Sequence, residues 1–94
     1  MLQVFNSQKF SPGCVVVTAN AALSLSNDDV STALRRHLRG DWGELDRHDR
    51  EANERALRQG GQLLSVYQSS KGQRYYVLTE ADRSATTLML PEDY

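Results

Sequence analysis

Apolar residues recur at intervals of three and four positions across residues 27–39, which is the pattern of a helix with one buried face. Ser26 and Asp29 have the spacing of a capping box at the start of this helix. Gly40 follows its last turn, and a glycine there closes a helix in the left-handed conformation. The pattern therefore predicts a helix over 27–39 that needs an apolar surface beneath it.

A second helix is predicted over 44–59, where opposite charges recur one helical turn apart. Asp41 and Glu44 have capping-box spacing at its start. Its apolar stripe is thin and consists of Leu45, Ala52, Ala56 and Leu57. Asp49 falls inside this stripe, so we expect a buried structural carboxylate, because an unpaired buried charge costs several kcal/mol. Its expected partner is either the backbone N–H groups of a turn or an arginine such as Arg83.

Three β-rich stretches follow over 62–68, 74–80 and 84–90, and short polar turns between them predict an antiparallel meander. Before the helices, residues 14–18 read C-V-V-V-T, a consecutive apolar run typical of a strand covered on both faces. Residues 19–25 suit about one helical turn. The predicted fold class is α+β, in the order strand-helix-helix-strand-strand-strand, with two helices on one face of a sheet of three or four strands. The sequence leaves the place of the first strand in that sheet open.

Length and charge narrow the class of protein further. The 94 residues suit a single domain over 1–94, with an irregular segment at 1–12 and an acidic tail at 91–94. The net charge of −1 excludes a polycation that binds nucleic acid through charge alone. No apolar run approaches the ~20 residues that span a bilayer, and the chain starts without a signal-peptide pattern. A single cysteine rules out an internal disulfide, so we expect a cytoplasmic protein with no membrane partner.

The sequence offers few groups for catalysis or metal binding. His37 and His48 lie on different predicted helices, without the spacing of a zinc motif. His37 falls on the buried face of its helix, and we interpret it as a core histidine with satisfied hydrogen bonds. Cys14 borders a run of valines, where the ordinary role is a small buried hydrophobic residue. We therefore predict no catalytic residue, no metal site and no cofactor.

Arginines and the one tryptophan gather where the first long helix ends. Tryptophan and arginine are enriched at the energetic centres of protein interfaces, so this corner is the first candidate surface for a protein partner. In the alternative interpretation, the arginines complete the helix dipole and Trp42 fills the corner between the helices. The connector after the second meander strand and the terminal aromatic residue are further candidates. The candidate partner-binding residues are Arg35, Arg36, Arg39, Asp41, Trp42, Asp82, Arg83 and Tyr94.

Two segments, G-D-W-G at 40–43 and T-E-A-D-R-S-A-T-T at 79–87, resemble a group of small uncharacterised bacterial proteins from plasmids, prophages and integrative elements. The resemblance implies an accessory role in a mobile element and brings no catalytic residue with it. We therefore expect a small non-enzymatic interaction protein that binds a protein partner and inhibits a host defence system, as anti-restriction and anti-CRISPR proteins do. The near-neutral charge argues against a DNA mimic, since such mimics are strongly acidic.

The element order also resembles that of RelE/ParE-type toxins, whose ribonuclease members cut messenger RNA with basic and aromatic residues on the sheet. Here Arg74, Arg83, Tyr75 and Tyr94 would fill those roles. The slightly acidic chain is unlike those basic ribonucleases, so nucleic acid is the less favoured partner. A further alternative is a homo-oligomer in which a subunit interface completes the thin stripe of the second helix.

Overall fold

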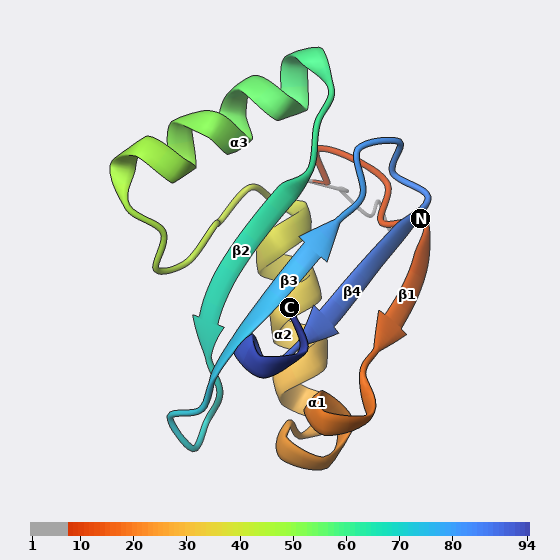
Figure 1. The fold of residues 1–94 in the computed structure, drawn as a ribbon, viewed down its shortest axis with the longest axis vertical. Coiled ribbons are helices and arrows are strands. Elements are labelled where there is room, and N and C mark those ends of the chain that lie inside the picture. The colour runs from red at the N-terminus through yellow and green to blue at the C-terminus, as the bar shows by residue number, and fades with distance from the viewer. Residues whose placement is uncertain (1–7) are drawn as a thin grey trace, which may run out of the picture.

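The described chain runs from one strand through three helices to three further strands, one helix more than the predicted order, and the α+β fold class is confirmed (Figure 1). The computed structural model describes residues 8–94. Residues 8–13 form no helix or strand, and the rest of the segment predicted to be irregular lies outside the described residues. The elements are β1 Cys14–Val17, α1 Ala19–Ser24, α2 Asn27–Leu38, α3 Arg47–Gln59, β2 Leu63–Gln68, β3 Arg74–Thr79, β4 Ala85–Met89 and the 3₁₀ turn η1 Pro91–Asp93.

The four strands form one mixed sheet in the order β1-β4-β3-β2. The meander of β2, β3 and β4 is antiparallel, as predicted. The first strand departs from that pattern, because β1 pairs with β4 in the parallel direction. A parallel neighbour requires a long crossover, which the three helices and the other two strands of the chain supply. The sheet therefore ends in β1 on one side and β2 on the other.

The prediction that the first strand is covered on both faces is wrong. Val15 and Val16 are each 42% exposed, because β1 is an edge strand with a neighbour on one side only. Cys14 is exposed as well, which contradicts its interpretation as a small buried residue. A consecutive apolar run describes the chemistry of a strand and leaves its position in the sheet open.

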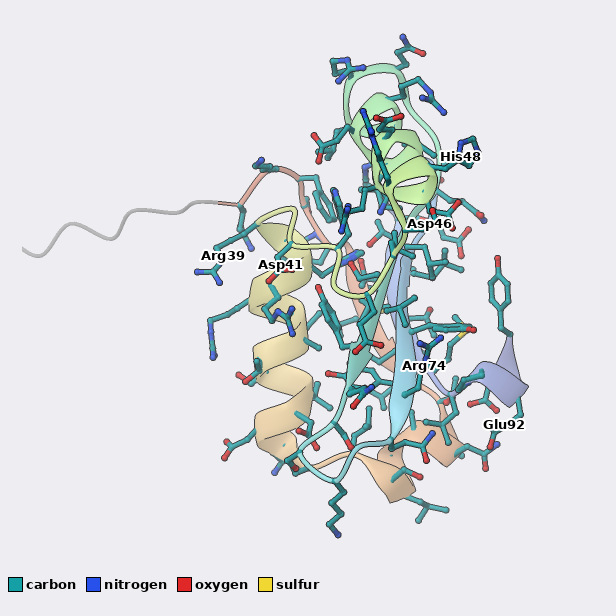
Figure 2. The ribbon with its side chains drawn as sticks, turned by 90° about the vertical axis from the view of Figure 1, so that its left-hand side faces the viewer. Arg39, Asp41, Asp46, His48, Arg74 and Glu92 are labelled. Atoms are coloured by element: carbon teal, nitrogen blue, oxygen red, sulfur yellow. The ribbon has the colours of Figure 1, made fainter. Side chains whose placement is uncertain are left out.

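Helices α1 and α2 cover one face of the sheet (Figures 1 and 2). The prediction placed the helices over 27–39 and 44–59 on that face, so α1 takes the place expected for the second of them. The main core lies between them and the sheet, where Ala33 of α2 packs in one cluster with Tyr67, Val77 and Leu88. The third helix, α3, lies at the upper end of the sheet beside β2 (Figure 1). Among residues 8–94, no helix comparable to α2 lies on the opposite face, and the turn η1 folds over part of that face (Figure 2).

The local signals at the helix ends are confirmed for α2 and displaced for α3. Ser26 and Asp29 form both bonds of the predicted capping box, and Gly40 adopts a φ of +82° after the last turn. In contrast, α3 begins at Arg47, three residues later than predicted, and its cap is Asp46. The segment before Asp46 pairs with the edge of β2, so it is extended and unavailable for a helical turn.

The prediction of a buried structural carboxylate at Asp49 is also wrong. Its side chain is exposed, and it is the backbone N–H of Asp49 that donates to the cap, Asp46 Oδ1, at 2.8 Å. The first turns of α3 project beyond the sheet, so only its later residues, Asn53 and Ala56, are buried. The predicted apolar stripe assumed that the whole helix packs on a surface. In the structure only the second half of α3 does so, and Asp49 lies in the first half.

Candidate interaction surfaces

The indole of Trp42 is buried, with 3% of the residue exposed. Its Nε1–H donates to Glu54 Oε2 of α3 at 2.8 Å, and its ring stands beside those of Phe10 and His37. The indole therefore joins the end of α2 to α3, as the alternative interpretation of this corner predicts. Trp42 is not accessible to a partner in this conformation.

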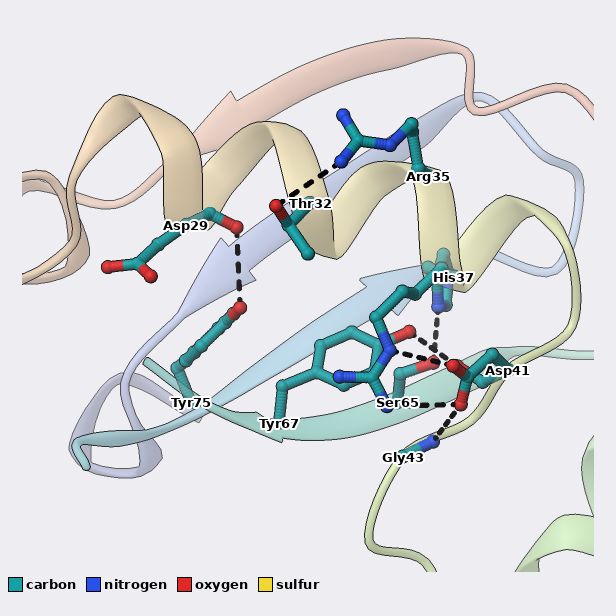
Figure 3. A network of polar contacts seen from close by, with 10 residues as sticks. Asp29, Thr32, Arg35, His37, Asp41, Gly43, Ser65, Tyr67 and Tyr75 are labelled. Carbon is teal, nitrogen blue, oxygen red and sulfur yellow. Dashed lines mark hydrogen bonds and ion pairs between the residues drawn. The ribbon is translucent and has the colours of Figure 1, made fainter. Parts of the chain in front are cut away.

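Arg36 and Asp41 form an ion pair with each other and stay partly exposed, with 37% and 44% of their side chains accessible. Figure 3 shows the Asp41 carboxylate of this pair, which also accepts from Gly43 N at 3.2 Å. The guanidinium of Arg36 donates to both carboxylate oxygens of Asp41, at 2.7 and 3.2 Å, and lies over the ring of Tyr67. Hydrogen bonding from Arg36 lowers the pKa of the Asp41 carboxyl below its usual value. Of the arginines at this end of α2, Arg35 and Arg39 are exposed and form no ion pair within residues 8–94, so they are the two whose charge no carboxylate of this part of the chain neutralises.

Arg83 is a structural residue of the loop between β3 and β4. It has a φ of +64°, and its guanidinium donates to Gly61 O at 2.7 Å and to Ala56 O at 3.0 Å. These carbonyls lie at the end of α3, so Arg83 caps that helix rather than pairing with Asp49 as expected. Beside it, Asp82 accepts from a backbone N–H two residues on and forms the turn that its sequence suggests.

Tyr94 is exposed over 68% of its surface and stands on the face of the sheet opposite α2. Its ring meets that of Tyr76 edge to face, with 5.7 Å between the ring centres. The tail is held in place, because the Asp93 carboxylate accepts from Thr18 Oγ1 and from Asn20 Nδ2, each at 2.7 Å. Tyr94 is thus an exposed aromatic on an ordered turn.

The most polar interior feature is a chain of hydrogen bonds through His37, which is fully buried. Its Nδ1 lies 2.6 Å from Ser65 Oγ and its Nε2 lies 2.9 Å from Thr79 Oγ1. Thr79 in turn contacts Thr86 Oγ1 at 2.7 Å, and Thr86 donates to the carbonyl of Pro12 at 2.8 Å. The prediction of a satisfied core histidine is confirmed.

The end of this chain fixes the direction of every bond in it. A carbonyl only accepts and each hydroxyl has one proton, so Thr86 donates to Pro12 and accepts from Thr79. His37 Nε2 then carries the ring proton, and Nδ1 accepts from Ser65. Burial lowers the pKa of His37 to about 4, with a smaller effect from the charge of Arg83. A hydroxyl bonded to an imidazole is a pair used in nucleophilic catalysis, but here both groups are buried and cannot reach a substrate.

Sequence reasoning missed an apolar row that crosses all four strands on the face opposite α2. Neighbouring positions in the register are Leu64, Leu78, Thr87 and Val16, in the order β2, β3, β4, β1. The residues that alternate with them, such as Val77, pack beneath α2, which places this open-face row on the other side. Leu78 is buried, Leu64 and Thr87 are half-buried, and exposure rises to 42% at Val16. Alternation within each strand indicates which residues share a face. Only the register between strands shows that these four positions lie side by side.

The chain itself covers the outer edge of β2. The side-chain amide of Asn53 donates to Leu64 O at 2.7 Å and accepts from Leu64 N at 3.1 Å, as a neighbouring strand would. Farther along, Val66 N donates to Trp42 O and Glu44 N donates to Val66 O. These bonds occupy the outward groups of β2 and leave β1 as the open edge of the sheet.

The residues invoked for a ribonuclease are not gathered into one exposed site. Tyr75 is buried under α2, and Arg83 is occupied by backbone carbonyls. Arg74 is exposed and pairs with Glu44 at 3.2 Å. Among residues 8–94 there is no group of three or more histidine, cysteine, aspartate or glutamate side chains placed to hold a metal ion. The helices of this part of the chain are also too short or too polar to cross a membrane.

Comparisons with known proteins identify no relative. No family model matches the chain, and neither the curated proteins nor the solved structures contain a detectable match. The resemblance to proteins of mobile elements therefore stays a prediction, and the function must be argued from the surfaces described above.

Proposed function

We propose that this chain is a non-enzymatic protein-interaction domain whose partner binds across the open-face row. The observation that carries the proposal is the asymmetry of the sheet within residues 8–94. Helices α1 and α2 cover one face, whereas the other face has η1 over one part (Figure 2) and Leu45 clustered with Val66 and Tyr76 at another. Val16, Thr87 and Leu64 leave apolar surface exposed there, and Tyr94 adds an exposed aromatic beside them. Apolar and aromatic groups at the centre of a patch favour a protein partner.

The placement of the polar groups supports a role without chemistry. The hydroxyl–imidazole pair of Ser65 and His37 is buried, and the Arg36–Asp41 pair is satisfied internally. Catalysis by general acids and bases needs such groups within reach of a substrate. Binding needs only a surface of matching shape and polarity, which the open-face row and the exposed ring of Tyr94 supply.

The partner that we propose is a protein of a bacterial defence system, and the protein would inhibit it by steric block. This part of the proposal is supported by the resemblance of residues 40–43 and 79–87 to proteins of plasmids and prophages. The near-neutral net charge is consistent with binding a protein surface rather than imitating DNA.

The test compares three variants with the wild-type protein in one host that has an active restriction or CRISPR system. Val16→Glu with Thr87→Glu places two charges on the open-face row. Leu23→Glu with Ser31→Glu is the matched control, because it adds the same charge at exposed positions of the helices. A third variant, Arg35→Glu with Arg39→Glu, tests the surface at the end of α2. Each protein is used for affinity capture and in transformation by a targeted plasmid.

We expect the wild-type protein and the matched control to capture the same partner in stoichiometric amounts and to raise transformation efficiency. The Val16→Glu and Thr87→Glu variant should lose both effects while it keeps the circular dichroism spectrum of the fold. If capture and transformation are lost only in the Arg35→Glu and Arg39→Glu variant, the partner binds at the end of α2 and the open-face row is not the binding surface. Capture of a partner without a change in transformation efficiency would support the interaction domain and would exclude a defence system as its target.

A further inference from the structure

The outer edge of β1 has backbone groups that no other part of the described chain occupies. Cys14 N donates to Ser84 O and Thr18 N donates to Leu88 O, both at 3.0 Å, so these residues point toward β4. Because backbone groups alternate along a strand, the N–H and C=O groups of Val15 and Val17 point away from the sheet. Within residues 8–94 these four groups have no hydrogen-bond partner.

The chain on either side of β1 turns away from this edge. On the N-terminal side, Pro12 O accepts from Thr86 Oγ1 of β4, and Gly13 lies so close to Ser84 that a Cβ would be 2.4 Å from its carbonyl oxygen. On the C-terminal side, Thr18 caps α1, and α1 packs against β4. Both flanks therefore return toward β4 and leave the edge of β1 uncovered.

The edge also lacks the features that keep edge strands apart. Cys14–Val17 contains no charged residue, no proline and no bulge, although such features commonly protect exposed edges. The opposite edge of the same sheet is covered by Asn53 and by residues 42–44. An edge that is short, apolar and unblocked is complementary to another strand of the same kind.

We propose that two copies of this chain associate by antiparallel pairing of their β1 strands about a two-fold axis at Val16. In this register, Val15 of each copy faces Val17 of the other, and each such pair exchanges two backbone hydrogen bonds. All four outward groups of each strand are then satisfied. The pairing joins the two sheets into one of eight strands and is independent of the partner proposed above.

The observations favour a second copy over an unrelated strand. Within β1, the outward backbone groups belong to Val15 and Val17. A two-fold axis at Val16 places the groups of Val15 in one copy opposite those of Val17 in the other, so a second β1 provides every partner that the edge requires. Facing valines are favourable cross-strand pairs, and no like charges meet because none occurs from Ser11 to Ser26. Symmetric two-fold contacts are the commonest arrangement in soluble oligomers.

The test is sedimentation of the purified chain from micromolar to millimolar concentration, with substitutions at an outward residue. Val15→Pro removes an N–H that has no partner within residues 8–94, so the fold is expected to remain, as prolines are accepted on strand edges. It deletes two of the four bonds in the dimer, and we expect the dissociation constant to rise about tenfold or more. Val15→Lys places a charge on the same edge and should also weaken the dimer. Leu23→Lys adds that charge at a residue of α1 that is 88% exposed and should leave the dimer unchanged.

The register has a separate readout, because Cys14 is the one cysteine of the chain and is exposed. In the proposed dimer, nitroxide labels on the two Cys14 residues have backbone positions about 14 Å apart. We expect the electron paramagnetic resonance spectrum of the labelled protein to show dipolar broadening. This broadening should disappear on dilution and in the Val15→Pro variant. A monomer at millimolar concentration, a dimer unaffected by Val15→Pro and Val15→Lys, or a dimer without broadening would overturn the proposal.

Discussion

Acidification should destabilise this protein through one buried side chain, His37, well before its carboxylates titrate. Burial disfavours the imidazolium ion and lowers the pKa of His37 from its ordinary value of 6.5 to about 4 in the folded chain. Below pH 6.5 the unfolded chain therefore binds a proton that the folded chain excludes. Each pH unit between these two values removes about 1.4 kcal/mol, so the free energy of unfolding falls by about 3 kcal/mol from pH 7 to pH 4. This loss is a large fraction of the stability of a small domain.

Urea unfolding followed by the fluorescence of Trp42 measures this effect, since the indole is the single tryptophan and is buried. His37→Gln removes the titrating group and should remove most of the slope between pH 6.5 and pH 4.5, although it lowers stability at neutral pH. His48→Gln is the matched control at an exposed histidine and should retain the slope. Equal stability of the wild-type protein at pH 7 and pH 4.5 would refute the reasoning, as would an unchanged slope in His37→Gln.

The carboxylates act in a different pH window. Hydrogen bonds lower the pKa of Asp29 and Asp41 below the ordinary value of 3.8 for an aspartate, the largest effects coming from Ser26 on Asp29 and from Arg36 on Asp41. A lowered folded pKa contributes stability that is present above pH 4 and is lost only as the pH falls further. Titration between pH 6.5 and pH 4.5 therefore reports the buried imidazole rather than these groups.

Three substitutions test other parts of the fold by the same urea assay. Gly43→Ala should lower the free energy of unfolding by at least about 2 kcal/mol, because φ is +74° and the new Cβ would collide with the carbonyl oxygen of Val66. Gly60→Ala has open space around it and should cost only about 1 kcal/mol. Equal losses in the two variants would contradict the close approach at Gly43. Trp42→Phe should cost about 1–3 kcal/mol, since Glu54 loses the indole donor, and a neutral result would count against that bond. Arg83→Lys should lower stability by about 2 kcal/mol, because an ammonium cannot reach the separate carbonyls that the guanidinium fork reaches; retention of wild-type stability would contradict the capping role.

The features that sequence predicted well are those decided by neighbours in the chain. The capping box of Ser26 and Asp29, the closure at Gly40 and the buried face of α2 each depend on residues within a few positions. His37 was assigned to the core for the same reason, because its place on that face follows from helical spacing. Such local signals hold where the rest of the fold leaves the segment free, as in α2, and fail where it does not, as at Asp41 and Glu44.

The features that sequence missed depend on contacts between distant segments. Asp49 was placed in a buried stripe, but α3 begins later than expected because residues 42–44 pair with β2. The exposure of β1 follows from its parallel pairing with β4 at an edge, which no property of the valine run reveals. The open-face row exists only through the register of four strands, so no single stretch of sequence contains it.

Hydrogen–deuterium exchange of the captured complex tests whether the partner binds the open-face row. Backbone amides of the free protein and of the complex are compared along the whole chain. We expect slower exchange in the complex within Cys14–Val17 and Ala85–Met89 and at Leu64, with α2 unchanged. Protection confined to residues 35–42, with β1 and β4 exchanging as in the free protein, would contradict it.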